Sequence, residues 1–348
     1  MSKVMVGMSG GVDSSVAAAM LQEQGHEVAG VTLRLWKESG DNEGEIRDAK
    51  RVCQALSIPH FVLDVRQTFR QTVVEDFINQ YRRGRTPNPC IVCNKKIKFG
   101  CMLEFALQQG YELISTGHYA EISVEQGRYC LLQSENLQKD QSYVLYHLTQ
   151  HQLAHCIFPL SSYCKAEIRK MAEEQHLPVA QKPDSQDICF LPPKDYAAFL
   201  QRQSGEMPPG DFINSKGEVI GRHQGIFHYT IGQRKGLGGT FGRPMFVLKI
   251  NPSDNTITLG EAGEEFSQSL RAGDVNFIDE TCRGQSFRAE VMVRYKSKRY
   301  PALITPDSDG TVTVSFDQPP RAVTPGQAAV FYRGRYVIGG GTILSDGA

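Results

Sequence analysis

The chain has 348 residues, and its 38 Lys and Arg balance its 38 Asp and Glu, so the formal net charge is zero. At roughly 100–200 residues per domain, this length predicts two or three domains. No apolar run approaches the roughly 18 residues of a membrane span, and no secretory signal opens the chain. We therefore expect a cytoplasmic protein without a membrane partner. Nine cysteines, an odd number in a long chain, disfavour a disulfide framework.

The first half alternates strand-like and helix-like segments. Strands are expected at residues 3–8, 27–36, 60–65 and 111–116, and helices at 14–24, 45–56, 68–83 and 94–109. This alternation predicts an α/β fold, a parallel sheet with helices on both faces. Ligands of such sheets bind beyond the carboxyl ends of the strands.

The pattern changes after about residue 205. Pro208 and Pro209 mark a linker, and short alternating runs follow at 246–250, 256–259, 289–295, 311–316 and 328–332. Residues 253–255 and 307–310 carry hairpin-turn signals. The second half is therefore expected to be all-β and barrel-like.

A glycine-rich segment joins the first strand to the first helix: Gly7-Met8-Ser9-Gly10-Gly11-Val12-Asp13-Ser14. Adjacent glycines let backbone N–H groups approach an anion, and the helix N-terminus adds partial positive charge. Its serines add hydroxyl donors, and Asp13 could help hold Mg²⁺. The segment is neither a Walker A loop nor a Rossmann GxGxxG. An ordinary glycine-rich turn is the alternative.

A second segment combines positive charge with cysteine. Residues 77–103 contain no acid but six cations: Arg82, Arg83, Arg85, Lys95, Lys96 and Lys98. Such a cluster predicts contact with a polyanion, the alternative being a solvated basic surface. Cys93 precedes the helix expected at Asn94, near two lysines, which should lower its thiol pKa. A buried inert thiol is the alternative. The acidic residues around Cys189 favour a structural cysteine there.

Six motifs occur in order: SGGVDSS at residues 9–15, TPNPCIVCNKKIKF at 86–99, TGHY at 116–119, KDQSY at 139–143, DSQDICF at 184–190 and TPGQ at 324–327. The first resembles the PP-loop of ATP pyrophosphatases, which cut ATP between the α and β phosphates. Together the motifs resemble the tRNA-specific 2-thiouridylase family over almost the whole chain. The resemblance implies a PP-loop domain at 1–204, a central β domain at 205–270 and a tRNA-binding β-barrel at 271–348.

The resemblance also implies the chemistry. ATP adenylates O2 of the wobble uridine, a persulfide on Cys189 attacks C2, and Cys93 resolves the persulfide through a transient Cys93–Cys189 disulfide. Alternatively, Cys93 first releases hydrosulfide. The products are 2-thiouridine, AMP and pyrophosphate. The implied cofactors are ATP and Mg²⁺, and the implied partners are the tRNAs for Lys, Glu and Gln and a cysteine desulfurase or sulfur-relay protein.

The family's binding positions carry over by motif. For ATP they are the loop from Gly7 to Ser14 together with Leu33 and Gly117. For tRNA they are Asn88, Pro89, Cys90, His118, Lys139, Asp140, Gln141, Arg294, Tyr295 and Gln327. Arg294, Lys296, Lys298 and Arg299 also form a basic cluster on an expected hairpin, where Tyr295 could stack on a base. For His118 alone, a core or nucleotide-side position is the alternative.

One position departs from the family. Many members carry a catalytic aspartate where this chain has Cys90, which could act as a base only as a thiolate. With Cys93 and Cys189 it offers three thiolates, enough for an iron–sulfur cluster. An iron–sulfur-dependent tRNA thiolase is therefore an alternative. Two further rivals are a different PP-loop synthetase and a non-enzymatic tRNA-binding protein.

Overall fold

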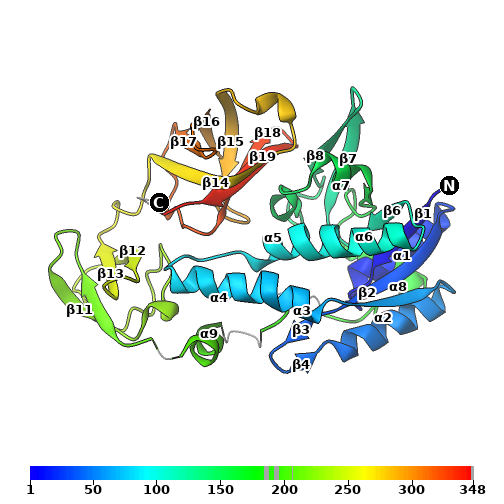
Figure 1. Cartoon of the computed structure of the whole chain (residues 1–348), viewed down its shortest axis with the longest axis horizontal. Coiled ribbons are helices and arrows are strands. Elements are labelled where there is room, and N and C mark those ends of the chain that lie inside the picture. Colours follow the sequence, from blue (N-terminus) through cyan, green and yellow to red (C-terminus); the bar gives the residue numbers. More distant parts are fainter. Residues whose placement is uncertain (184–187, 192–195, 206, 346–348) are drawn as a thin grey trace.

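The computed structural model describes residues 1–183, 188–191, 196–205 and 207–345. Figure 1 shows three parts: an α/β domain, a small β domain coloured green to yellow, and an orange-to-red barrel. Two long helical segments, in cyan, run between the barrel and the rest of the α/β domain. No helix within the described ranges is long and apolar enough to cross a membrane.

The α/β domain is built on five parallel strands. Their spatial order is β5 (His60–Asp64), β2 (Glu27–Arg34), β1 (Lys3–Gly7), β6 (Leu113–Ser115) and β9 (Cys156–Ile157). The chain moves outward from β1 to β5, then returns to place β6 on the other side of β1. This reversal puts a ligand-binding crevice beyond the carboxyl ends of β1 and β6. The predicted parallel sheet is confirmed.

Helices connect and cover these strands. They are α1 (Val12–Glu23), α2 (Glu43–Ala55), α3 (Arg66–Phe69), η1 (Arg70–Val74), α4 (Glu75–Arg82), α5 (Pro89–Cys93), η2 (Asn94–Cys101), α6 (Met102–Gln108), η3 (Ser142–Leu145), α7 (Gln150–Ala154), α8 (Lys165–Glu174) and α9 (Tyr196–Ser204). α3 to α4 run on without a break, as do α5 to α6, and η1 and η2 are π-helical turns within them. A short ribbon of β3 (Trp36–Lys37) and β4 (Gly40–Asp41) follows β2.

The helix expected from Asn94 begins at Pro89 instead. Asn88 is its N-cap, and its Oδ1 accepts a hydrogen bond of 3.1 Å from the N–H of Cys90. Proline suits the first helical position because it lacks the N–H that would go unpaired there. The helix therefore starts at Pro89, and Cys93 belongs to the interior of the continuous α5–η2 helix.

The small β domain has four strands. Their order is β11 (Val219–His223), β10 (Gly210–Ile213), β13 (Thr256–Gly260) and β12 (Phe246–Asn251), with the short helix η4 (Ile226–His228) beside them. The predicted hairpin turn is confirmed, since Asn255 takes a positive φ of 54° between β12 and β13. α9 packs on both α4 and η4, so this domain and the α/β domain share a core.

The barrel has six antiparallel strands. Their order is β14 (Ser269–Phe277), β17 (Val312–Phe316), β16 (Tyr300–Pro306), β15 (Phe287–Met292), β18 (Ala328–Arg333) and β19 (Tyr336–Ile343), closed by pairing of β14 with β19; η5 (Glu280–Cys282) follows β14. The predicted β-barrel is confirmed.

A hairpin of the α/β domain extends the sheet of the barrel. It consists of β7 (Ala120–Glu125) and β8 (Arg128–Gln133), and β8 pairs with β19 where Leu132 faces Tyr336. This hairpin was not predicted from the sequence. Gln126 and Gly127 both take positive φ, of 50° and 77°, as in the tight turns that join twisted strands.

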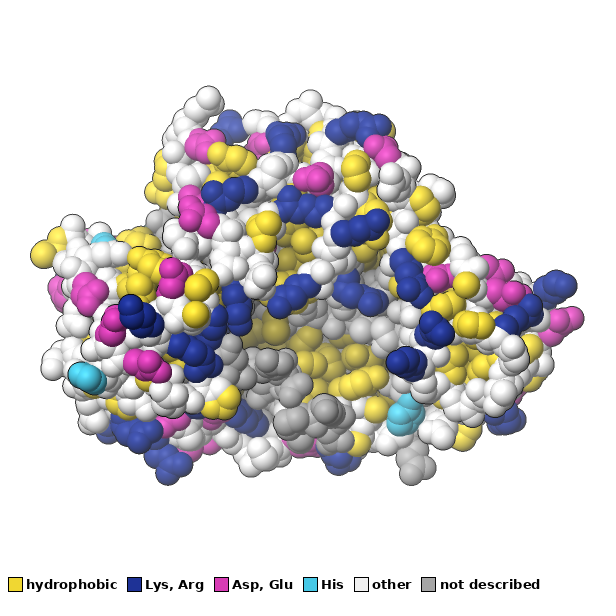
Figure 2. All heavy atoms as spheres, turned by 180° about the vertical axis from the view of Figure 1, so that it is seen from behind, with side chains coloured by type: hydrophobic (Ala, Val, Ile, Leu, Met, Phe, Trp, Pro, Cys, Tyr) yellow, Lys and Arg dark blue, Asp and Glu magenta, His cyan; other side chains and the backbone are white. Residues whose placement is uncertain are grey.

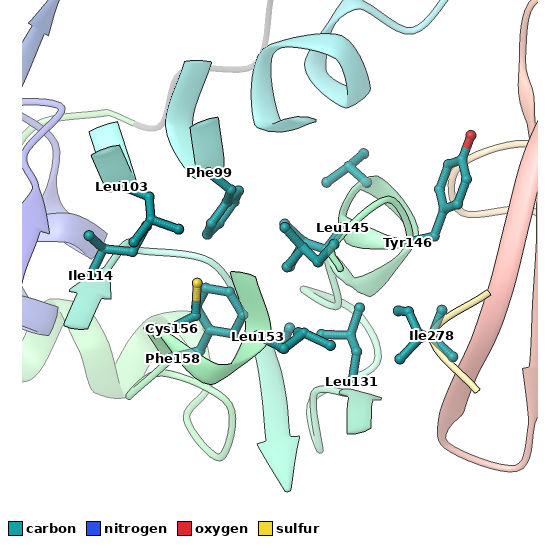
Figure 3. Packing of buried hydrophobic residues seen from close by; sticks show 14 of the residues in the cluster. Phe99, Leu103, Ile114, Leu131, Leu145, Tyr146, Leu153, Cys156, Phe158 and Ile278 are labelled. Carbon is teal, nitrogen blue, oxygen red and sulfur yellow. The ribbon is translucent and has the colours of Figure 1, made fainter. Parts of the chain in front are cut away.

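A continuous apolar core joins the α/β domain to the barrel. Figure 3 shows Phe99 of η2 and Leu103 of α6 packed toward Leu145 and Leu153, with Ile278 next to the barrel. Phe99, Leu145 and Leu153 are at most 1% exposed. Each such side chain contributes about 1.5–3 kcal/mol by leaving water, so this core holds the two parts in one arrangement.

Candidate active site

The glycine-rich segment lies where the sheet order reverses. The N–H of Ser9 donates to Oγ of Ser14 at 3.2 Å, and the two hydroxyls are 3.1 Å apart. Gly11 is the N-cap of α1 in an extended conformation, and as a glycine it has no side chain to cover the first N–H groups of the helix. The segment is therefore shaped as a cradle for an anion.

Two glycines permit close packing around this cradle. Gly10 has a φ of +67°, and a Cβ there would lie 2.6 Å from the carbonyl oxygen of Glu45. A Cβ on Gly117 would lie 2.8 Å from the N atom of Ser14. The loop after β6 thus sits directly against the start of α1, which brings the predicted nucleotide positions from two strands together.

Other positions predicted to bind ATP are Gly7, Met8, Val12 and Leu33. Met8 and Val12 are 2% and 4% exposed, so their side chains belong to the core. Leu33 lies at the end of β2, where its carbonyl oxygen accepts a 2.9 Å hydrogen bond from Asn42. Gly7 ends β1.

Asp13 is not a free side chain on a turn. Its Oδ1 accepts hydrogen bonds of 2.7 Å from the hydroxyl of Tyr119 and from Nζ of Lys165. Nearby, Nζ of Lys182 donates to the carbonyl oxygen of Gly10 at 2.9 Å and to Asp48 at 2.7 Å. The cradle therefore carries two lysines to which no sequence motif had pointed.

Two of the three candidate cysteines, Cys90 and Cys93, belong to α5, and Cys189 is near enough to influence the pKa of Cys93. Cys93 is buried, at 7% exposure, whereas Cys90 and Cys189 are exposed. Cys90 and Cys189 both raise the pKa of Cys93, and Cys90 raises the pKa of Cys189. Of the surrounding DSQDICF motif, residues 184–187 lie outside the described residues.

The expected low pKa of Cys93 is wrong. Burial raises the pKa of the Cys93 thiol to about 12, against the opposing charge of Lys98. Desolvation likewise raises the pKa of Cys189 to about 11 and that of Cys90, with Lys98 again opposing. The expectation failed because Cys93 lies inside the helix rather than at its N-terminus, and loss of hydration outweighs the lysine.

The charge of Lys98 affects both the thiols and the loop that follows β6. It acts electrostatically on all three cysteines and also on His118, next to Gly117. His118 is 7% exposed, and its Nδ1 lies 2.7 Å from the hydroxyl of Thr116. Burial holds the pKa of His118 well below its usual range, so the ring is neutral.

Three soft thiolates would suit an iron–sulfur cluster by donor type. Among the described residues, no group of three or more His, Cys, Asp or Glu side chains is arranged to hold a metal ion. The cluster stays a prediction.

The predicted RNA positions divide into two groups. The first borders a cavity of about 940 Å³ between residues 133–140 and the β15–β16 hairpin. Tyr295 lines it, and its hydroxyl donates to the carbonyl oxygen of Asp140 at 3.1 Å. Lys296, Lys298 and Arg299 line it too, on the hairpin predicted to carry them.

Within this group, the side chains of Asp140 and Gln141 form hydrogen bonds to other parts of the protein. The Asp140 carboxylate is buried and accepts hydrogen bonds from Gln133, Ser134 and Ser142. Gln141 exchanges hydrogen bonds with the backbone of Tyr119. Lys139 is partly exposed on the same loop.

The second group lies near the α5–η2 helix. Asn88, Lys95 and Lys96 line a cavity of about 490 Å³ between this helix and the barrel. Gln327 donates from Nε2 to the carbonyl oxygen of Thr86 at 2.7 Å, and Pro89 is buried in the first turn of the helix. Arg294 donates a hydrogen bond of 2.9 Å to Oγ1 of Thr324.

Figure 2 shows Lys and Arg side chains gathered around a hollow in the middle of the face seen there.

Fold and site together define a class: an α/β domain with a glycine-rich anion cradle, followed by two β domains. Three family models match in succession, described as a tRNA methyl transferase HUP domain over residues 2–193, a tRNA methyl transferase PRC-barrel domain over 197–261 and an aminomethyltransferase β-barrel domain over 267–343.

Curated relatives match almost end to end. A tRNA-specific 2-thiouridylase MnmA of Pelotomaculum thermopropionicum is 48% identical, covering 99% of this chain and 98% of the relative. The protein of the same name from Acetivibrio thermocellus is 47% identical, covering 98% and 99%. The chain belongs to the tRNA-specific 2-thiouridylase family, which confirms the family predicted from the six motifs.

Solved structures give a weaker likeness. A 4-thiouridine synthetase–RNA complex with bound ATP is 18% identical, covers 58% of this chain and 50% of its own, and has a TM-score of 0.37. An NMN synthetase from Francisella tularensis is 17% identical, covers 53% and 66%, and has a TM-score of 0.35. At these scores neither likeness bears on fold or function.

Proposed function

We propose that this chain makes 2-thiouridine in tRNA, by adenylating O2 of the wobble uridine with ATP and delivering sulfur from Cys189 to C2. One observation carries the proposal. An exposed thiol, Cys189, lies near a buried thiol, Cys93. The charge of Lys98 lowers the pKa of both thiols and also that of His118, which follows the predicted nucleotide position Gly117.

The ATP step uses the cradle. The phosphate chain would lie against the N–H groups at the start of α1 and the hydroxyls of Ser9 and Ser14, while Asp13 would hold Mg²⁺. Mg²⁺ supplies charge neutralisation on the phosphates when bound. Attack of uridine O2 on the α-phosphorus forms the O–P bond and expels pyrophosphate, which leaves C2 open to a nucleophile because AMP is a good leaving group.

The sulfur step assigns different work to the two thiols. Cys189, being exposed, receives sulfur from a protein donor, a cysteine desulfurase or relay protein. Its terminal persulfide sulfur attacks C2, the C–S bond forms, and AMP leaves with the electron pair. Cys93 is buried, so we expect it to react with Cys189 rather than with bulk thiols. Its thiolate attacks Sγ of Cys189, the persulfide S–S bond breaks, and thiouridine is released with a Cys93–Cys189 disulfide. An external dithiol then reduces that disulfide.

The high pKa values of the Cys93 and Cys189 thiols fit a site that stays inactive until its substrates bind. Protonated thiols react slowly with oxidants and electrophiles, so Cys93 would become a thiolate only when substrate charge and Lys98 act together. Cys90 is also protonated at neutral pH, which leaves it without the basicity of the aspartate found in many relatives.

The tRNA would lie along the hollow between the barrel and the α/β domain. A wobble uridine is cheap to unstack because it is single-stranded, and aromatic rings such as that of Tyr295 can receive a neighbouring base. Arg82, Arg83 and Lys96 are exposed and would meet phosphates. The tRNAs for Lys, Glu and Gln are the proposed substrates.

The test is a single-turnover assay on full-length protein. Cys189 is loaded with labelled persulfide, then mixed with Mg-ATP and an unmodified tRNA carrying wobble uridine. One labelled sulfur in 2-thiouridine, one AMP and a Cys93–Cys189 disulfide per turnover are expected. In Cys93→Ser, direct transfer from the persulfide should stop at an adduct in which the tRNA is bonded to Cys189 through the transferred sulfur, because no thiol can break the S–S bond. Label in tRNA without AMP would contradict the proposal.

A further inference from the structure

Lys165 lies beside the phosphate cradle, although it comes from a segment without a nucleotide motif. It is the first residue of α8, which packs against α1. Its Nζ is 2.7 Å from Oδ1 of Asp13, and its side chain is only 16% exposed, against 33% for Asp13. The ammonium is therefore held at the edge of the loop that would take the ATP phosphates.

The contact between Lys165 and Asp13 is suited to exchange. Tyr119 donates to the same carboxylate oxygen, so Asp13 keeps a hydrogen-bond donor if Lys165 turns away. A lysine ammonium on its four-carbon stem can move to a neighbouring oxygen without backbone movement. A triphosphate in the cradle would present far more negative charge than one carboxylate, so the ammonium would be drawn toward it.

We propose that Lys165 is a catalytic residue of the adenylation step, which exchanges Asp13 for the phosphate chain when ATP binds. This rests on the proposed function. As uridine O2 bonds to the α-phosphorus, the bond from that phosphorus to the α–β bridging oxygen breaks, and pyrophosphate leaves with the electron pair. Lys165 keeps its proton and stabilises the charge that grows on the departing pyrophosphate. Asp13 is left with a carboxylate for Mg²⁺.

Lys182 provides a comparison within the same cradle. Its Nζ donates to the carbonyl oxygen of Gly10 and to Asp48, so it ties the loop to α2. Lys182 thus contacts a backbone carbonyl oxygen of the loop, whereas Lys165 contacts a carboxylate that would also bind Mg²⁺. Lys182→Met should therefore weaken the binding of both ATP and AMP, because the loop becomes looser. Loss of Lys165 should weaken the binding of ATP and pyrophosphate but not that of AMP.

The experiment measures binding of ATP, AMP and inorganic pyrophosphate to the full chain by titration calorimetry, with Mg²⁺ and again with EDTA. Lys165→Met should weaken ATP and pyrophosphate about ten- to a hundredfold in both buffers, the size of a lost charged hydrogen bond, and leave AMP unchanged. Asp13→Asn should weaken ATP only with Mg²⁺. Lys170→Met, exposed on the same helix, should match the parent in all titrations.

Three outcomes would overturn the assignment: equal losses for ATP and AMP, a loss confined to Mg²⁺ buffer, or unchanged binding. The first two would make Lys165 a support for the loop or for Asp13. The rate of tRNA-dependent AMP release separates this inference from the proposed function. A normal rate in Lys165→Met with none in Asp13→Ala would refute the role of Lys165 alone. Normal rates in both would refute the ATP-dependent function as well.

Discussion

Cys93 and Cys189 are electrostatic neighbours of opposite accessibility: Cys93 is 7% exposed inside a helix, and Cys189 is exposed. The order in which the two thiols react with a small electrophile should follow that difference. At pH 7 to 9, iodoacetamide should modify Cys189 well before Cys93.

The rate of this alkylation should rise with pH. Only the thiolate reacts, and the pKa of Cys189 is raised to about 11, so the thiolate fraction should grow about tenfold per pH unit below that value. Peptide mapping by mass spectrometry gives both rates. Buried Cys53, whose pKa burial raises to about 12, should stay unmodified and serves as the internal control. Faster labelling of Cys93 would contradict the assigned roles.

Asp13→Ala should abolish tRNA thiolation, with ATP-dependent AMP release reduced at least about a hundredfold, because the carboxylate at the cradle is lost. The variant also leaves Lys165 without this partner, so a modest loss of stability is expected. Circular dichroism should still report a folded protein. Tyr119→Phe removes one hydrogen bond to the same oxygen and should be much milder. Normal turnover in Asp13→Ala would mean that the cradle does not bind ATP.

Binding of tRNA should weaken steeply with salt because lysines and arginines displace counterions from phosphates. Arg82→Glu with Arg83→Glu should reduce the slope of log K against log[salt] by about 0.7–0.9 for each phosphate that the variant no longer neutralises. Both side chains are exposed, so the fold should tolerate the change. Arg243→Glu, on an exposed loop of the small β domain, is the matched control. An unaltered slope in the double variant would place the RNA elsewhere.

Cys90→Asp tests the role of the residue that departs from the family. We expect substantial activity without iron, because the proposed route needs one sulfur carrier and one resolving thiol. As a cluster ligand Cys90 would be essential, and Cys90→Asp would lose iron and activity together. Thiolation assays distinguish these two roles when they are combined with analysis of iron and acid-labile sulfide in anaerobically purified protein. An inactive, iron-depleted variant beside an active, iron-loaded parent would establish the cluster instead.

His147 should make stability depend on acid pH. Burial lowers the pKa of His147 to about 4, with Lys95 also lowering it and Asp274 opposing. The folded state thus binds its proton only near pH 4, whereas the unfolded chain binds it near pH 6.5. Stability from the neutral ring is complete above pH 6.5 and is lost as pH falls toward 4, by about 3 kcal/mol.

Melting temperatures measured between pH 4 and 7 check this dependence. His147→Gln should flatten the curve over that range, although its stability at pH 7 falls. Exposed His151→Gln should keep the parental slope. A parental slope in His147→Gln would assign the acid sensitivity to other groups.

Local patterns in the sequence were enough for the family, the parallel sheet and the β-rich second half. Hydrophobic periodicity and turn residues act over a few positions, so the strands at residues 3–7 and 256–260 and the turn at Asn255 followed from their own neighbours. The PP-loop motif could be assigned in the same way, because its glycines and the helix that follows are contiguous.

Only the tertiary structure decided how the thiols behave. The sequence placed Cys93 before a helix and beside lysines, which predicted a low pKa. The folded chain extends that helix back to Pro89 and buries the thiol, and desolvation then exceeds the attraction of Lys98. Burial depends on what packs over a residue from elsewhere in the chain, and that information is not local.

Long-range contacts decided the rest. Lys165 reaches Asp13 across 152 residues of sequence, and the β7–β8 hairpin joins the sheet of the barrel through Leu132 and Tyr336, which lie far apart along the chain. The burial of the Asp140 carboxylate among hydrogen bonds from Gln133 and Ser134 was likewise not evident from the sequence. Each depends on segments that are distant in the sequence, and the entropy cost of ordering them is offset only when the whole fold forms.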